Sequence, residues 1–236
     1  MEEVKKLIQD AKKITFLTGA GMSTASGIPD FRSSKGLKGK HIPFEKLLSL
    51  PYFKSNRAEF WDNLYEILHL DTLHMKEPNI GHKWIADLQK DKKIWVVTQN
   101  IDALHQKAGS ENVIEVHGNL VGGHCTKCKE IHSIDYSLGA LPNCPKDDLL
   151  LKPNIVLYGE DVYGMHDGIT HAVTSDVVIV MGTSLQVFPF NSLVDNAAMS
   201  PTTKTILVNE SETEKDRLFD YKLNMNIVDF VKEVTR

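Results

Sequence analysis

Five segments of the chain share one pattern of hydrophobic and polar positions. Each begins with a lysine or another polar residue, continues through a short run rich in β-branched residues, and ends in small polar residues. The segments span residues 12–21, 92–100, 112–118, 176–184 and 204–211. Runs that are apolar on both faces are typical of central parallel strands covered by helices. The pattern therefore predicts parallel strands at these five places.

Helical stretches alternate with the predicted strands. The sequence "GHKWIADLQK" at 81–90 follows the first strand, and "PFNSLVDNAAM" at 189–199 follows the fourth. This alternation predicts an α/β fold with a doubly wound, Rossmann-like parallel sheet. In such sheets a ligand binds where the strands end, and here the strand ends carry Gly, Thr, Gln, Asn, Asp, His and Ser.

Two segments interrupt the alternation. Residues 33–80 contain helical stretches such as 57–70 and no convincing strand, while residues 118–152 hold all three cysteines. We interpret them as a helical insertion and a zinc-ribbon-like insertion that together build a smaller module. Residues 1–32, 81–117 and 153–236 are then expected to form the Rossmann-like domain.

Composition and charge narrow the class of protein. The 236 residues carry a net charge of -4 with scattered lysines, which disfavours a nucleic-acid partner. The N-terminus lacks the apolar core of a signal peptide, and the run "VVIVM" at 177–181 is far shorter than the ~20 residues of a membrane span. We expect a cytoplasmic protein without a membrane partner. The sequence leaves the oligomeric state open and favours a monomer.

The cysteines have the spacing of a metal site. Cys125 and Cys128 form a C-x2-C pair, and Cys144 resembles the first half of a second pair. An odd number of cysteines, two of them at this spacing, makes a disulfide framework the weaker interpretation.

The stretch "TGAGMSTASGIPDFR" at 18–32 follows the first strand, where a phosphate-binding turn belongs. Gly19 and Gly21 allow a tight turn and close backbone approach, but Thr24 replaces the third glycine of the dehydrogenase fingerprint. A dehydrogenase would also need a second strand ending in Asp or Glu about 20 residues later. The sequence there, 34–45, is no strand. The loop is thus expected to bind a dinucleotide in a manner unlike that of a dehydrogenase.

Five motifs in order resemble those of the sirtuin family of NAD-dependent protein deacylases. They are "GAGMSTASGIPDFR", "TQNIDALHQKAG", "VHGNL", "NIVLYGE" and "GTSLQVFP", and the match runs from residue 14 to about 210. The resemblance implies that NAD is cleaved to nicotinamide and that an acyl group passes from a lysine to ADP-ribose. Acyl-lysine proteins or peptides would be the substrates.

The resemblance also implies roles for individual residues. His117 would be the general base, which a histidine suits because its unperturbed pKa of ~6.5 is close to working pH. Asn100 would assist it by ordering the ribose and nearby water, together with Gln99. Asp102 and the backbone of Ile101 would hold the nicotinamide amide. The cofactor-binding set is Gly19, Ala20, Gly21, Thr24, Phe31, Arg32, Gln99, Asn100, Ile101, Asp102, Thr183, Ser184 and Asn209.

By the same resemblance, the substrate peptide would enter as an added strand between "YGE" at 158–160 and "SLQVF" at 184–188. The substrate-binding set is Phe31, Val156, Tyr158, Gly159, Glu160 and Val187. Tyr158 stands where Phe is common, and Lys152 stands where Arg is common; these departures put fine acyl preference in doubt.

Sirtuins that prefer succinyl or malonyl groups carry a Tyr and an Arg three residues apart, where this chain has Trp61 and Leu64. A carboxylate clamp needs an Arg. We therefore expect neutral acyl groups such as acetyl to be preferred.

In sirtuins four cysteines usually hold a structural zinc. This chain reads C-x2-C-x15-C-x2-D, which places Asp147 at the fourth position beside Cys125, Cys128 and Cys144. A carboxylate is an accepted zinc ligand. His124 and His132 are competing ligands, and a metal-free loop held by packing is the alternative.

Two other functions stay open at this point. A mono-ADP-ribosyltransferase would use the same ribose carbon, and a catalytically silent module would bind NAD without turnover. His117 favours deacylation over the first alternative, and the polar set Gln99, Asn100, Asp102 and His117 argues against the second.

Overall fold

The computed structural model describes residues 1–30 and 43–236. Within these residues, six parallel strands form the main sheet, in the order β3-β2-β1-β7-β8-β9. The strands are β1 (Lys13–Thr18), β2 (Lys93–Thr98), β3 (Val113–Glu115), β7 (Val177–Met181), β8 (Lys204–Asn209) and β9 (Tyr221–Asn224). Counted along the chain, the order is that of a doubly wound dinucleotide-binding sheet. The predicted α/β fold is confirmed, and the strand order reverses between β1 and β7.

All five predicted strands are present, and β9 is an additional one at the edge of the sheet. Its burial alternates between half-buried and exposed positions, with Tyr221 and Leu223 on the half-buried face. Such a short alternating strand lacks the continuous apolar run by which the central strands were predicted.

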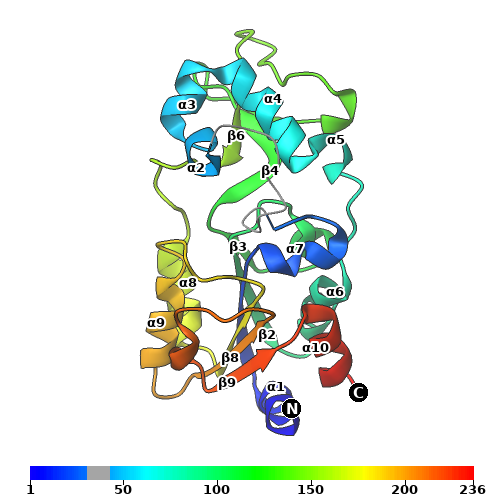
Figure 1. Cartoon of the computed structure of the whole chain (residues 1–236), viewed down its shortest axis with the longest axis vertical. Helices are drawn as coiled ribbons and strands as arrows, with labels where there is room; N and C mark the ends of the chain where they lie inside the picture. The colour runs from blue at the N-terminus through cyan, green and yellow to red at the C-terminus, as the bar shows by residue number, and fades with distance from the viewer. Residues whose placement is uncertain (31–42) are drawn as a thin grey trace.

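Helices cover both faces of the sheet, as Figure 1 shows. On β1, Ile14 and Phe16 pack with α1 (Glu2–Asp10), α6 (Ile80–Leu88) and α10 (Ile227–Val234). Leu17 points to the opposite face and packs with α8 (Met165–Val173) and α9 (Ser192–Met199). Successive residues of a strand point to opposite faces, so a strand that is apolar throughout builds two cores.

Local signals explain where two of these helices begin. The side-chain oxygen of Asn79 accepts hydrogen bonds from the backbone N–H groups of Gly81 and His82, and Asn226 accepts one from Asp229. Both are N-caps, which satisfy backbone donors left free at a helix start.

A smaller module lies at the other end of the molecule (Figure 1). It combines α2 (Phe44–Leu47), α3 (Leu50–Ser55), α4 (Arg57–Leu68) and α5 (Leu70–Leu73) with a three-stranded antiparallel sheet. The sheet has the order β5-β4-β6, with β4 (Gly118–His124), β5 (Ile131–Ser133) and β6 (Lys152–Ile155). Phe60, Trp61 and Leu64 share one core with Leu120 of β4 and Ile155 of β6.

The two predicted insertions therefore meet in one core, and β6 belongs to the small sheet although it extends beyond residue 152. The exact three-segment division remains a prediction.

The short elements are α7 (Leu104–Lys107), η1 (Ala20–Met22), η2 (Thr24–Ser26), η3 (Tyr136–Leu138) and η4 (Asp216–Leu218). In the described part of the chain, every helix is too short or too polar to cross a membrane.

Candidate active site

A cavity opens at the carboxyl ends of the main-sheet strands, where the strand order reverses. Bounded by the described residues, it measures ≈ 1470 Å³. It extends from the loop after β1 to the segment 155–162 that follows β6, so both parts of the molecule contribute to its wall. Open α/β sheets bind ligands at this place.

The glycines after β1 allow two loops to pack backbone against backbone. A Cβ atom on Gly21 would lie 2.8 Å from the Cα of Gly182, and one on Gly19 would lie 2.7 Å from the Cβ of Thr183. Gly182 itself has a φ of 62°, in the left-handed region that favours glycine. The glycine loop is thus held against the loop after β7, a packing reason that the sequence did not reveal.

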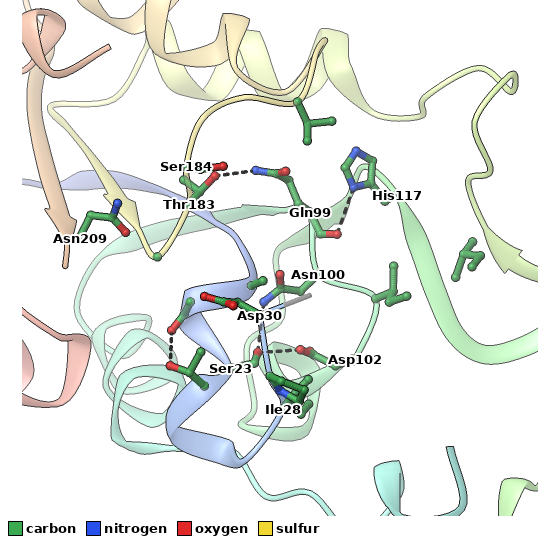
Figure 2. Close-up of a pocket in the computed structure, with 18 of the residues that line it drawn as sticks. Ser23, Ile28, Asp30, Gln99, Asn100, Asp102, His117, Thr183, Ser184 and Asn209 are labelled. Atoms are coloured by element: carbon green, nitrogen blue, oxygen red, sulfur yellow. Dashed lines mark hydrogen bonds between the residues drawn. The ribbon is translucent and has the colours of Figure 1, made fainter. Parts of the chain in front are cut away.

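A chain of hydrogen bonds connects the glycine loop to the loop after β2. The Asn100 amide nitrogen donates to the Gly19 carbonyl at 3.0 Å and to the Ser23 hydroxyl oxygen at 3.1 Å. Ser23 Oγ in turn donates to Asp102 Oδ2 at 2.6 Å, as Figure 2 shows. Ser23 therefore holds two predicted site residues in place, although sequence reasoning passed over it. Its position inside the glycine motif was the available signal.

The Asp102 carboxylate also accepts a hydrogen bond from the Leu104 N–H at 2.9 Å, which begins α7. Burial raises the pKa of Asp102 above its ordinary value, while the hydrogen bonds from Ser23 and Leu104 act in the opposite direction. Ala103, which lies between Asp102 and Leu104 in the chain, has a φ of 57°. Backbone strain of this kind is often kept at functional sites.

His117 is oriented by a backbone carbonyl. Its Nδ1 lies 3.1 Å from the Gln99 oxygen (Figure 2). Because a carbonyl oxygen can only accept, Nδ1 must carry the proton in this hydrogen bond, and the lone pair of the neutral ring lies on Nε2. The Gln99 amide donates to Thr183 Oγ1 at 2.9 Å, so the same residue joins the ends of β2 and β7. A histidine held in this way can act as a proton acceptor.

Most of the predicted site residues line this one cavity. They are Ala20, Gly21, Thr24, Gln99, Asn100, Ile101, Asp102, His117, Val156, Tyr158, Gly159, Glu160, Thr183, Ser184, Val187 and Asn209. Gly19 lies behind the lining, and Phe31 and Arg32 lie outside the described residues. The lining also includes Ser23, Ile28 and Asp30, which the sequence did not single out as site residues.

The described lining is acidic. It contains no Lys or Arg, and its carboxylates are those of Asp30, Asp102, Glu160, Asp161, Glu210, Glu212 and Asp229. Asn209 is steadied by a hydrogen bond from its amide to the Ser211 carbonyl at 2.7 Å. At the described surface, an anionic ligand would therefore depend on uncharged hydrogen-bond donors, among them backbone N–H groups.

The cysteine cluster lies in the small module. The ligand atoms of Cys125, Cys128, Cys144 and Asp147 all lie within 4.8 Å of one another. The sulfur atoms of Cys128 and Cys144 are 3.7 Å apart, and Cys125 Sγ lies 3.4 Å from Asp147 Oδ2. Two thiolates bound to one tetrahedral zinc at ~2.3 Å would lie ~3.8 Å apart. The four predicted ligands thus have the spacing of a tetrahedral metal site, and the three cysteines are free thiols.

Two histidines near the cluster differ in their partners. His124 Nδ1 lies 3.2 Å from the Asn154 side-chain oxygen, and His124 belongs to neither group of candidate metal ligands. His132 Nε2 lies 3.9 Å from Cys144 Sγ and groups with Cys128 and Glu130. Of the two predicted competitors, His132 is the one in reach of the cluster.

Comparison with known proteins adds to this geometry. A model of the Sir2 family matches residues 19–189. An NAD-dependent protein deacetylase of Bacillus anthracis is 43% identical over 233 residues, covering 98% of this chain and 96% of the relative. One from Bacillus subtilis (strain 168) is 35% identical over 243 residues, covering 99% and 98%.

Solved structures are similar over the whole chain. A complex of Sir2 with a p53 peptide and NAD+ has a TM-score of 0.87 and 33% identity, covering 100% of this chain and 97% of that one. A Sir2 complex with an inhibitor, 2′-O-acetyl-ADP-ribose and a deacetylated p53 peptide has a TM-score of 0.86 and 32% identity, with the same coverage.

Proposed function

Because the chain belongs to the Sir2 family, we propose that it is an NAD-dependent protein lysine deacetylase. One NAD is consumed for each acyl group removed: nicotinamide leaves, and the acyl group passes from lysine to ADP-ribose. The observation that carries the proposal is the Gln99–His117 pair beyond the carboxyl ends of β2 and β3, inside a cavity that reaches the small module. The relatives named above support the same activity.

We place NAD across the carboxyl ends of β1, β2, β7 and β8. Ala20, Gly21 and Thr24 would follow its phosphates, and Thr183, Ser184 and Asn209 would contact the cofactor farther along. Arg32 would supply a cation for the phosphates from outside the described residues. The backbone N–H groups of the glycine loop are the other donors that suit a phosphate.

The nicotinamide amide would bind near Asp102 and the backbone of Ile101. The carboxylate of Asp102 already accepts hydrogen bonds from Ser23 and Leu104, yet each oxygen can accept more than one. Asp102 can therefore accept from the amide NH2 while Ser23 and Leu104 hold it still. Such fixed positioning lowers the barrier for a weak nucleophile such as an amide oxygen.

His117 would act as the general base. With its proton on Nδ1, the Nε2 lone pair can take a proton from a ribose hydroxyl, so that this oxygen can attack the acyl carbon. Asn100 would order the ribose and nearby water from the opposite side, held by Gly19 and Ser23. Residues that follow β2 and β3 and residues of the glycine loop would thus share the chemistry.

The peptide would add a strand between segments 158–160 and 184–188. Tyr158 is already paired on one side, since its N–H donates to the Leu48 carbonyl and its own carbonyl accepts from the Leu50 N–H. Among the described residues, the backbone groups of Gly159 and the N–H groups of Gln186 and Val187 have no hydrogen-bond partner. Unpaired backbone groups in a cleft suit an extended peptide and tolerate varied side chains.

Neutral acyl groups suit the described part of the pocket. Trp61 and Leu64 are fully buried and do not line the cavity, and Trp61 Nε1 donates to the Leu151 carbonyl at 2.8 Å. Among the described residues of the helical segment, those that line the cavity are apolar: Phe44, Leu48, Leu68 and Leu73. A carboxylate on the acyl chain would find no basic partner on this described surface.

One assay tests the proposal. The purified protein is incubated with NAD and an acetyl-lysine peptide, and the products are separated by mass. We expect nicotinamide, free lysine peptide and O-acetyl-ADP-ribose in equal amounts, and a loss of about 10²- to 10⁴-fold in rate for His117→Ala with NAD binding retained. His166→Ala, a change at an exposed histidine, serves as the matched control. ADP-ribosylated protein, or no product, would overturn the proposal.

We further propose that Cys125, Cys128, Cys144 and Asp147 hold a structural zinc. Lys127 Nζ holds Asp147 Oδ1 at 2.8 Å, which leaves Oδ2 on the side of Cys125. A zinc here would tie the loop after β4 to the loop before β6. Elemental analysis should find about one zinc per chain. Protein purified without chelator and containing no zinc would contradict this assignment.

We also propose a cytoplasmic location for this protein. None of the three cysteines forms a disulfide, which suits a reducing compartment, where disulfides are rare. Cell fractionation with an antibody against the chain would test this.

A further inference from the structure

An ion pair joins buried Lys152, which lies outside the described cavity lining, to half-buried Glu160, which lines the cavity. Lys152 is the first residue of β6, and its Nζ lies 2.8 Å from Glu160 Oε2. The side chains are 7% and 23% exposed. The Lys152 ammonium also donates to the Ile155 carbonyl at 2.8 Å and to the Pro153 carbonyl at 3.2 Å. All three ammonium hydrogens therefore have acceptors, as a buried charge requires.

The pair closes the turn from Leu157 to Glu160. The Glu160 oxygen that binds Lys152 also accepts from the Leu157 N–H at 2.8 Å, and the Glu160 N–H donates to the Leu157 carbonyl at 2.9 Å. Gly159, inside this turn, has a φ of 96°. That conformation strains any residue with a side chain, so the turn depends on glycine and on the contacts at its two ends.

This turn carries the backbone groups that the peptide would meet. Gly159 lines the cavity, whereas Lys152 lies outside the described lining. Backbone bonds fix the chain before and inside the turn: the Val156 N–H donates to the His117 carbonyl at 2.8 Å, and Tyr158, within the turn, pairs with Leu48 and Leu50. Glu160 adds a side-chain link from the end of the turn to Lys152 of the small sheet.

A buried ion pair gives little net stability, since the cost of removing two charges from water offsets their attraction. The Lys152–Glu160 pair is therefore better explained by a role in fixing the geometry of this turn than by a contribution to stability. A cation that carries several N–H donors suits the position, because three oxygens converge on the Lys152 ammonium.

We propose that Lys152 is a positioning residue for the peptide substrate. Through Glu160 it holds the Leu157–Glu160 turn so that Gly159 presents its backbone groups to the cleft. The inference rests on the proposed function. It predicts that Lys152 affects peptide binding and leaves NAD binding and turnover at saturating peptide unchanged.

The test separates KM from kcat. Lys152→Met keeps the length of the side chain and removes the charge; we expect the KM for the acetyl peptide to rise about 10- to 100-fold, as when a hydrogen bond to a charged group is lost. The kcat and the NAD KM should stay within about 3-fold, and Lys152→Arg should restore the peptide KM to within about 3-fold of wild type. Lys204 of β8 forms an exposed ion pair with Asp220. Lys204→Met breaks this pair; it is the matched control and should change none of these values.

A second variant distinguishes loss of positioning from misfolding caused by an unpaired charge. Lys152→Met combined with Glu160→Gln removes both charges, so no unpaired charge stays buried. If Lys152 and Glu160 act as one unit, the double variant should have the same peptide KM as Lys152→Met. If they act independently, the rise in its peptide KM should be the product of the rises caused by Lys152→Met and by Glu160→Gln alone. Independent effects, an unchanged peptide KM, or a loss confined to kcat or NAD affinity would each overturn the proposal. Failure of the deacetylase proposal is a distinct result, because the wild-type protein would then show no turnover at all.

Discussion

Acid should destabilise this protein through two buried histidines, one in α6 and one in α7. His82 of α6 and His105 of α7 lie with their ring centroids 4.8 Å apart, and both are buried. Neither ring nitrogen of His82 has a hydrogen-bond partner among the described residues, while His105 Nε2 lies 3.0 Å from Thr18 Oγ1. Burial lowers the pKa of His82 to about 4, and burial together with the neighbouring His82 lowers the pKa of His105 well below its ordinary value.

The sign follows from proton uptake on unfolding. A histidine with an unfolded pKa of ~6.5 and a lower folded pKa binds its proton mainly in the unfolded chain, so stability is present above pH ~6.5 and is lost as the pH falls towards the folded pKa. In that window each such histidine lowers the free energy of unfolding by about 1.4 kcal/mol for every unit by which the pH falls. Between pH 7 and pH 5, His82 alone should therefore reduce the free energy of unfolding by about 2 kcal/mol, and His105 adds to the loss in the same direction.

The assay is urea unfolding of the wild type and of His82→Leu at pH 7 and pH 5. Leucine has a similar volume and no titrating group, so the variant should lose about 2 kcal/mol less than the wild type between the two pH values. His166→Gln changes an exposed histidine and should retain the wild-type difference. If wild type and His82→Leu lose the same free energy, the burial argument for His82 is wrong.

Three further predictions concern the active site and the metal cluster. Ser23→Ala removes the donor to Asp102 and should raise the KM for NAD about 10-fold or more, measured at saturating peptide; an unchanged KM would contradict the role of this hydrogen bond. An acetyl-lysine peptide should be turned over faster than its succinyl twin, because Trp61 and Leu64 offer no carboxylate clamp; the reverse ranking would refute this. Asp147→Cys should slow zinc release to a chelator and Asp147→Ala should speed it, whereas His132→Ala should not change it; faster release from Asp147→Cys would argue against this ligand set.

Several features could be predicted because they are local in the sequence. The continuous apolar runs that form β1, β2 and β7 indicated buried parallel strands, and the polar residues that follow them, such as Gln99 and Thr183, marked the ligand-binding edge. The spacing of Cys125 and Cys128 indicated a metal site, and the motifs around His117 indicated the family. The edge strand β9 was not predicted, because its alternation of half-buried and exposed residues extends over only 4 residues.

The remaining features depend on contacts between residues far apart in the chain, which no local pattern encodes. The Asn100–Ser23–Asp102 hydrogen bonds join residues almost 80 positions apart, and Gly19 owes its lack of a side chain to the approach of Thr183. The tautomer of His117 is decided by the Gln99 carbonyl, at the end of a neighbouring strand. The sequence by itself determined which residues stand at the strand ends and which chemistry they offer. Only the tertiary structure decided which of them hold one another, because a hydrogen bond requires atoms within about 3 Å, and chain folding alone brings them there.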